Sequence, residues 1–93
     1  MKEITEEKLK KYFAITEEAL EKARNSEQKI NIEGARDDFI DMVERYIADA
    51  RHFMEKGDWV NAFAALNYAH GWLDAGARIG IFDVHDSRLF TVD

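Results

Sequence analysis

Three polar side chains capable of chemistry fall within one short stretch, NYAHGWLDAG. His70 and Asp74 are four residues apart and Asn67 precedes His70 by three, so a helix would place them on neighbouring turns. Such a group could be half of a metal site or a His–Asp acid/base pair. It could also be a polar cluster that orients itself and satisfies buried backbone groups. We expect this second role, without a metal or cofactor, because the remaining histidines, His52 and His85, supply no ligand set.

A second pair, Arg45 and His52, has six residues between its members. This spacing resembles the Arg-x(4–6)-His pattern of nucleases of the HEPN superfamily. The order of residue types in GDWVNAFAALNYAH is also similar to sequences of that superfamily. The resemblance implies an RNA-processing activity as an alternative function. Both residues lie with Asp49 on the charged face of one helical repeat, where a solvated ion network is the ordinary explanation.

Composition limits the functions open to this chain. Its 93 residues suit one domain, 1–93, and 46% hydrophobic with 34% charged residues fit a folded protein. A net charge of −6 argues against a nucleic-acid partner, and the absence of cysteine removes thiolate catalysis and Cys-ligated zinc. The charged N-terminus, MKEITEEKLKKYF, is not a signal peptide, so we expect a cytoplasmic protein.

Hydrophobic periodicity predicts three helices and a tail. Apolar residues recur at three- and four-residue steps over residues 5–24, 33–56 and 58–79. Thr5 and Asp58 are N-cap residues, and Gly57 can end the second helix in a left-handed conformation. Without proline and with short connections, these segments predict an all-α fold, an antiparallel up-down-up three-helix bundle. Residues 80–93 are expected to form an irregular tail.

The third helix is apolar around most of its circumference, which is typical of a central helix. Asn67, His70 and Asp74 make it an improbable membrane span despite its length. One apolar face is expected in the core, and a second face carries a candidate interaction surface, Tyr68, Trp72 and Ile79. Tyr68 and Trp72 could instead pack on Tyr12 and Phe13 of the first helix.

The second face of this helix is expected to be covered. Its Trp–Tyr–Ile stripe would otherwise be an exposed apolar patch. Residues 81–90 supply complementary apolar side chains, and a second copy of the chain in a two-fold dimer is the alternative cover. Gly71 and Gly76 are expected to allow close approach of a neighbouring backbone.

Two stretches, RYIADARHFMEKG and GDWVNAFAALNYAHGWLDAGARIGIF, resemble the archaeal family of small proteins called domain of unknown function 357. The resemblance is strong over residues 39–82 and most specific in YAHGWLDAG. It implies an archaeal cytoplasmic protein with a three-helix bundle and brings no catalytic residues. From the residues themselves we expect no enzyme, but an interaction or scaffold module that binds a protein partner or a second copy. A metal-dependent enzyme using His70 and Asp74, or the HEPN-like activity, is the alternative.

Overall fold

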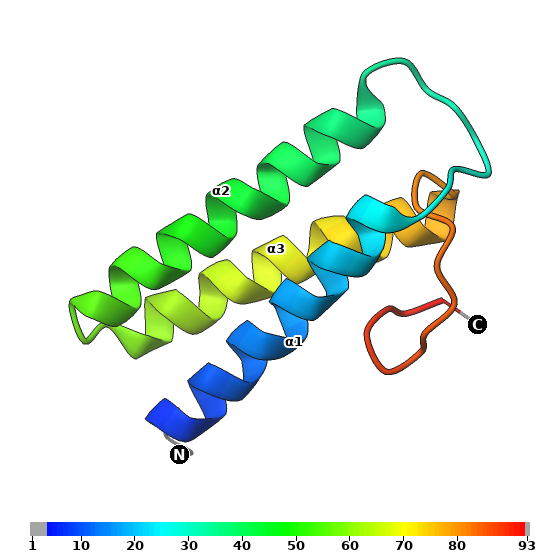
Figure 1. Ribbon diagram of the computed structural model, residues 1–93. Helices are drawn as coiled ribbons and strands as arrows, with labels where there is room; N and C mark the ends of the chain where they lie inside the picture. The colour runs from blue at the N-terminus through cyan, green and yellow to red at the C-terminus, as the bar shows by residue number, and fades with distance from the viewer. Residues whose placement is uncertain (1–3, 93) are drawn as a thin grey trace.

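The computed structural model describes residues 4–92, which form three helices and a C-terminal segment (Figure 1). In chain order the helices are α1 (Glu6–Asn25), α2 (Ala35–Glu55) and α3 (Trp59–Ile79). They run up, down and up, and residues 4–92 contain no strand, so the predicted all-α three-helix bundle is confirmed. The expected domain, 1–93, also includes residues 1–3 and 93, which lie outside the described residues.

The helix ends follow the capping chemistry predicted from the sequence. The Thr5 hydroxyl accepts a hydrogen bond from Lys8 N at 3.1 Å, and the Asp58 carboxylate accepts one from Asn61 N at 3.2 Å. These acceptors satisfy amides that a helix N-terminus otherwise leaves unpaired. Gly57 has a φ of 76°, which lets the chain reverse between α2 and α3 within a few residues. The three helices therefore begin and end within two residues of their predicted bounds.

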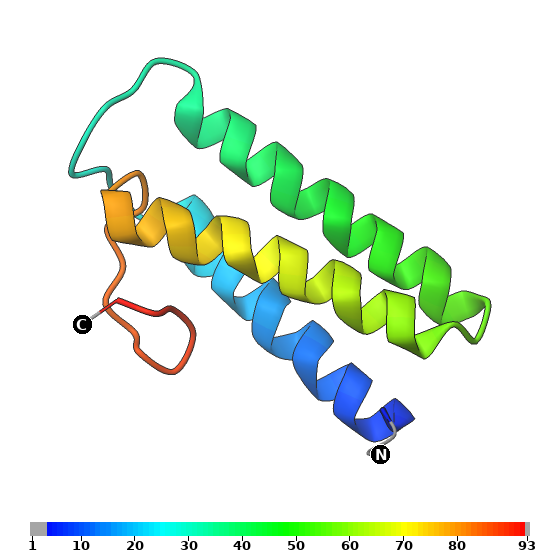
Figure 2. The same ribbon diagram turned by 180° about the vertical axis from the view of Figure 1, so that it is seen from behind.

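Helix α3 is the central element of the bundle. It packs against both α1 and α2, whereas α1 and α2 make few contacts with each other. Both views show α1 and α2 diverging on either side of α3 (Figures 1 and 2). The apolar character of α3 reflects its central position. Within residues 4–92, no helix has the length and hydropathy that crossing a bilayer requires.

The C-terminal segment, residues 80–92, is irregular but belongs to the core. It folds back beside α3 (Figure 1), and its four largest apolar side chains are buried: Ile81, Phe82, Leu89 and Phe90. Burial of such side chains contributes about 1.5–3 kcal/mol each, which a bundle of this size needs. The expected irregular tail is therefore also part of the hydrophobic core.

Arg36, at the start of α2, links the end of α1 to the start of the C-terminal segment. This role is not among those predicted from the sequence. Its guanidinium donates hydrogen bonds to the carbonyl oxygens of Ala23, Arg24 and Ser26 at 2.6–3.0 Å, and to Ile81 O at 3.2 Å. The charge therefore lies at the negative C-terminal end of α1. One signal could have revealed this role: a cation in the first turn of α2 opposes that helix's own dipole, so it should serve another element.

Candidate interaction surface on α3

The flank of α3 that carries His70 is covered by α1 and by the C-terminal segment. His70 Nε2 hydrogen-bonds to Leu89 O, and Nδ1 lies 3.3 Å from Thr16 Oγ1. A carbonyl oxygen can only accept, so Nε2 carries a proton and, in the neutral ring, Nδ1 accepts from the Thr16 hydroxyl. Thr16 is only 2% exposed, and this bond satisfies its hydroxyl. His70 thus links three elements of the fold.

Asp74 acts on the same flank, one turn further along α3. Its carboxylate accepts a hydrogen bond from Thr91 N at 2.9 Å and lies 3.9 Å from His70 Nε2. Of the two arrangements that the polar-cluster interpretation allows, bonding to each other or to nearby backbone, both residues adopt the second, with backbone of the C-terminal segment. Asn67 does not join them; it is exposed and lines one edge of a hollow on the neighbouring, uncovered side of α3.

Two ion pairs hold the C-terminal segment to α1. Lys22 Nζ lies 2.9 Å from the Asp86 carboxylate, and Arg88 pairs with Glu18. The hydrogen bond from Lys22 lowers the pKa of Asp86, and the hydrogen bond from Arg88 lowers the pKa of Glu18. The Glu18 carboxylate in turn raises the pKa of Arg88. These shifts favour the charged form of each group.

The candidate catalytic pairs do not form a recognisable centre. No three His, Asp or Glu side chains of residues 4–92 come together in the way that metal ligands would. Arg45 and His52 are both exposed on α2, and Arg45 Nε donates to Asp41 at 2.9 Å, one turn away. This is the solvated ion pair that the charged face of α2 predicts.

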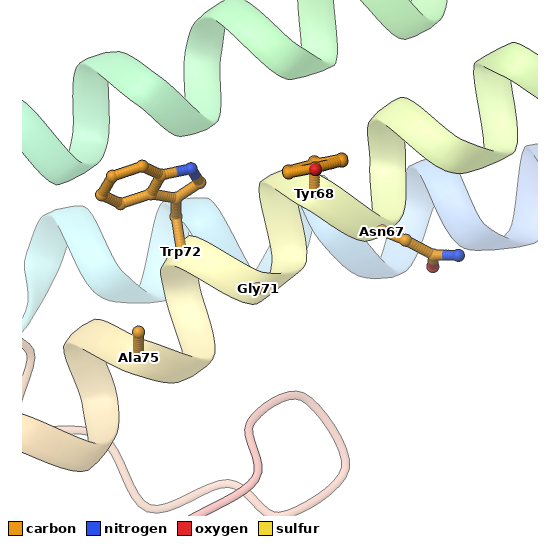
Figure 3. Close-up of a pocket in the computed structure, with 5 residues that line it drawn as sticks. All are labelled: Asn67, Tyr68, Gly71, Trp72 and Ala75. Atoms are coloured by element: carbon orange, nitrogen blue, oxygen red, sulfur yellow. The ribbon is translucent and has the colours of Figure 1, made fainter.

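The opposite flank of α3 carries a shallow apolar hollow of about 600 Å³. Figure 3 shows the side chains that line it: Asn67, Tyr68, Gly71, Trp72 and Ala75. Gly71 forms its middle, and a Cβ built there would meet nothing within 4 Å. A partner could therefore reach the α3 backbone at Gly71, which no element within residues 4–92 approaches.

Aromatic contacts with α2 fix one wall of the hollow. Tyr68 stacks on Tyr46 with ring centroids 5.1 Å apart, and Trp72 meets Phe39 edge to face at 5.0 Å. These arrangements are favourable for aromatic pairs. They also settle the partner of Trp72 and Tyr68, which is α2 and not Tyr12 or Phe13 of α1. Tyr12 packs instead on Phe63.

The hollow is part of a longer uncharged strip, which we call the open face of α3. It consists of exposed residues at helical spacing: Val60, Ala64, Tyr68, Gly71, Ala75 and Ile79. Val60 is 68% exposed, Tyr68 62% and Ile79 48%. Arg78 is the only charged residue among the exposed positions of α3, whereas the exposed positions of α1 and α2 are nearly all charged. Such a strip is what interaction sites present to solvent.

Two expectations about this face are wrong. The C-terminal segment does not cover Tyr68 and Trp72, because its contacts with His70 and Asp74 keep it on the other flank. Gly71 does not allow a close approach within the chain, but Gly76 does. A Cβ on Gly76 would lie 2.6 Å from Phe82 Cδ2, and the Phe82 ring is 0% exposed.

These features define a small all-α protein whose central helix is held on one flank and open on the other. The chain belongs to the family described as protein of unknown function (DUF357), whose model matches residues 11–82. The match covers most of α1 and all of α2 and α3. It confirms the family resemblance and assigns no activity. Neither the curated proteins nor the solved structures contain a match to this chain.

Proposed function

We propose that this chain is a non-catalytic interaction module that binds a protein on the open face of α3. The observation that carries the proposal is the contrast in exposed residues: the open face is uncharged, while the outer faces of α1 and α2 are charged. An apolar strip in water costs free energy, at about 25 cal/mol for each Å², and burial in an interface recovers it.

The geometry of the hollow suits protein binding. Trp72 and Tyr68 are held by α2, so little side-chain entropy is lost when a partner covers them. Tryptophan and tyrosine are also favoured anchors of interfaces. A net charge of −6 favours a protein partner over a nucleic acid. An archaeal, cytoplasmic setting is part of the proposal, because the resemblance of the sequence to this family implies it.

The way in which the reactive side chains are used supports a non-catalytic role. His70 is occupied by Thr16 and Leu89, and Asp74 by Thr91 N. A general base must reach the proton that it abstracts from a substrate, and these groups instead face the fold. Their role is to hold the C-terminal segment, which keeps that segment away from the open face.

Substitution of Gly71 tests the proposal. Gly71→Glu places a charge in the hollow without a clash, because nothing lies within 4 Å of the added Cβ. Tagged chain is used to capture proteins from native lysate, with purified untagged chain added as one possible partner. We expect Gly71→Glu to lose a protein that the original chain retains.

Ala48→Glu is the matched control, since Ala48 is exposed on the charged outer face of α2. It should retain the same protein. Retention of every captured protein by Gly71→Glu would overturn the proposal.

A further inference from the structure

We infer that the open face of α3 binds a second copy of this chain, in a two-fold dimer whose axis runs along α3. The inference rests on the proposed function, because it names the occupant of the same face. The charges at the two edges of that face and the area that it offers favour this occupant.

One edge of the open face carries hydrogen-bond donors. Arg78 is exposed, and its guanidinium donates to Thr91 O at 3.0 Å, which places it beside the C-terminal segment. It has no carboxylate partner within residues 4–92. Asn67 lies on the same edge and points away from Tyr68 and Trp72 (Figure 3). Asn67 and Arg78 are eleven residues apart, which is about three helical turns.

The other edge carries two carboxylates, those of Asp38 and Asp49, beside Arg45, whose guanidinium is paired with Asp41. Glu44 and Arg51 of α2 pair with α1, whereas Tyr46 packs on α3. At about 100° per residue, Asp38 and Asp49 fall beyond Tyr46 on the flank of α2 away from α1. Both are exposed, and neither has an ion-pair partner in the described part of the chain. They are also eleven residues apart.

A two-fold axis parallel to α3 creates two equivalent contacts between these edges, one on each side of the axis. It places the α2 edge of each copy against the Arg78 edge of the other, with the open faces in contact at Gly71. Because α2 runs antiparallel to α3, Asp38 lies level with the C-terminal half of α3 and Asp49 with its N-terminal half. Asp38 of one copy is then matched with Arg78 of the other, and Asp49 with Asn67.

The register of these matches follows from the aromatic contacts. Phe39 lies level with Trp72 along the helix axis, and Tyr46 with Tyr68. Asp38 is therefore about one helical turn from the level of Arg78, and Asp49 is similarly offset from Asn67. Packed helices usually cross at about 20–50°, and such a crossing slides the partner's α2 along α3 by several ångströms. The alternative axis, across α3, would set the two acidic edges against each other, which is unfavourable.

The face is also large enough. Helix α3 has 21 residues and is about 31 Å long, and the molecule measures 40 × 25 × 20 Å. The open face and its two edges together have about that length and the 20–25 Å width of the molecule, which gives about 600–800 Å² on each copy, close to a standard interface. A single docked helix would cover only the middle of this strip and leave both charged edges unmatched.

Charge exchange between the two edges provides the test. Arg78→Asp and Asp38→Arg should each weaken the dimer by at least about tenfold, because each variant creates two like-charge contacts in a two-fold dimer. An equimolar mixture of the two variants should associate again, because the mixed dimer has opposite charges at both contacts. The measurement is sedimentation equilibrium, at physiological ionic strength, from micromolar to millimolar chain.

Two control variants carry the same changes of charge at positions outside the two edges. Lys11→Asp and Asp37→Arg alter exposed residues of α1 and α2 outside the two edges, and both should dimerise like the original chain. Thermal unfolding of each variant at low concentration, where the chain is monomeric, separates folding from association.

The inference is wrong if the original chain has the monomer mass of 10.8 kDa throughout, or if the mixture does not associate. A monomeric chain that still loses another captured protein through Gly71→Glu would leave the proposed function intact. Retention of all captured proteins would contradict that function itself.

Discussion

The covered and the open parts of the α3 surface contain similar residues but have different environments. Each has a glycine, a polar side chain and apolar neighbours. Gly76 lies against the Phe82 ring, and His70 and Asp74 hold the backbone of the C-terminal segment. Gly71 has open space around it, and Asn67 faces solvent. An apolar helix face can therefore belong to the core or to an interface, and the position of a neighbouring element decides which.

Removal of residues 81–93 should have the largest effect. It exposes the surfaces that Ile81, Phe82, Leu89 and Phe90 cover. Each buried side chain contributes about 1.5–3 kcal/mol, so the loss exceeds the roughly 5 kcal/mol by which small domains are stable. We expect no cooperative thermal transition by near-ultraviolet circular dichroism. A truncated chain that melts cooperatively near the original temperature would show that the covered flank is not part of the core.

Arg36→Met should lower the free energy of unfolding by about 2–3 kcal/mol, because several carbonyl oxygens lose a charged donor. Denaturation in urea measures the change. Arg45→Met is the control: it removes only an exposed pair with Asp41 and should change stability by less than about 0.5 kcal/mol. Equal effects of the two substitutions would refute the role given to Arg36.

Gly76→Ala should destabilise the fold by about 1–2 kcal/mol. The new methyl group would overlap the buried Phe82 ring, and overpacking outweighs the gain in helix propensity.

Gly71→Ala is the matched control on the open flank and should have the opposite sign. It gains about 0.5–1 kcal/mol of helix propensity and meets nothing. Urea denaturation of both variants gives the comparison directly. Destabilisation by Gly71→Ala would mean that this flank is packed within the chain.

Acid should have the smallest effect. The folded-state pKa values of Glu18 and Asp86 are lowered, so these carboxylates stabilise the fold above their ordinary values of 4.5 and 3.8. Their contribution is lost as the pH falls through the lowered pKa values. The double variant Glu18→Gln, Asp86→Asn should therefore lose less stability between pH 5 and pH 2 than the original chain, as measured by melting temperature. An identical acid profile would show that these pairs do not hold the segment.

The sequence predicts where the helices begin and end, but it does not predict which side of α3 the C-terminal segment covers. Thr5, Gly57 and Asp58 mark helix ends through local chemistry, which a sequence displays directly. The flank on which the C-terminal segment lies depends on contacts between distant residues, such as Arg36 with Ile81 and His70 with Leu89. Local patterns carry no signal for these contacts.

The same limit applies to the candidate site. Helical spacing predicts that Tyr68 and Ile79 lie on the surface of α3. In the structure, both side chains are exposed. The same spacing predicts Trp72 on that face, but it carries no signal for the contact of Trp72 with Phe39 of α2. Gly71 and Gly76 look alike in the sequence, and only the position of Phe82 separates them.

Thiol labelling at Gly71 tests the central claim most directly, because the chain has no cysteine of its own. Gly71→Cys introduces one thiol on the open face, and Ala48→Cys introduces one on the charged face of α2. We expect both thiols to react rapidly with a maleimide in dilute chain. At concentrations where sedimentation shows association, the labelling rate of Gly71→Cys should fall in step with the fraction of dimer, and that of Ala48→Cys should not. An unchanged rate for Gly71→Cys in associated chain would show that the complex forms elsewhere, and would contradict the account.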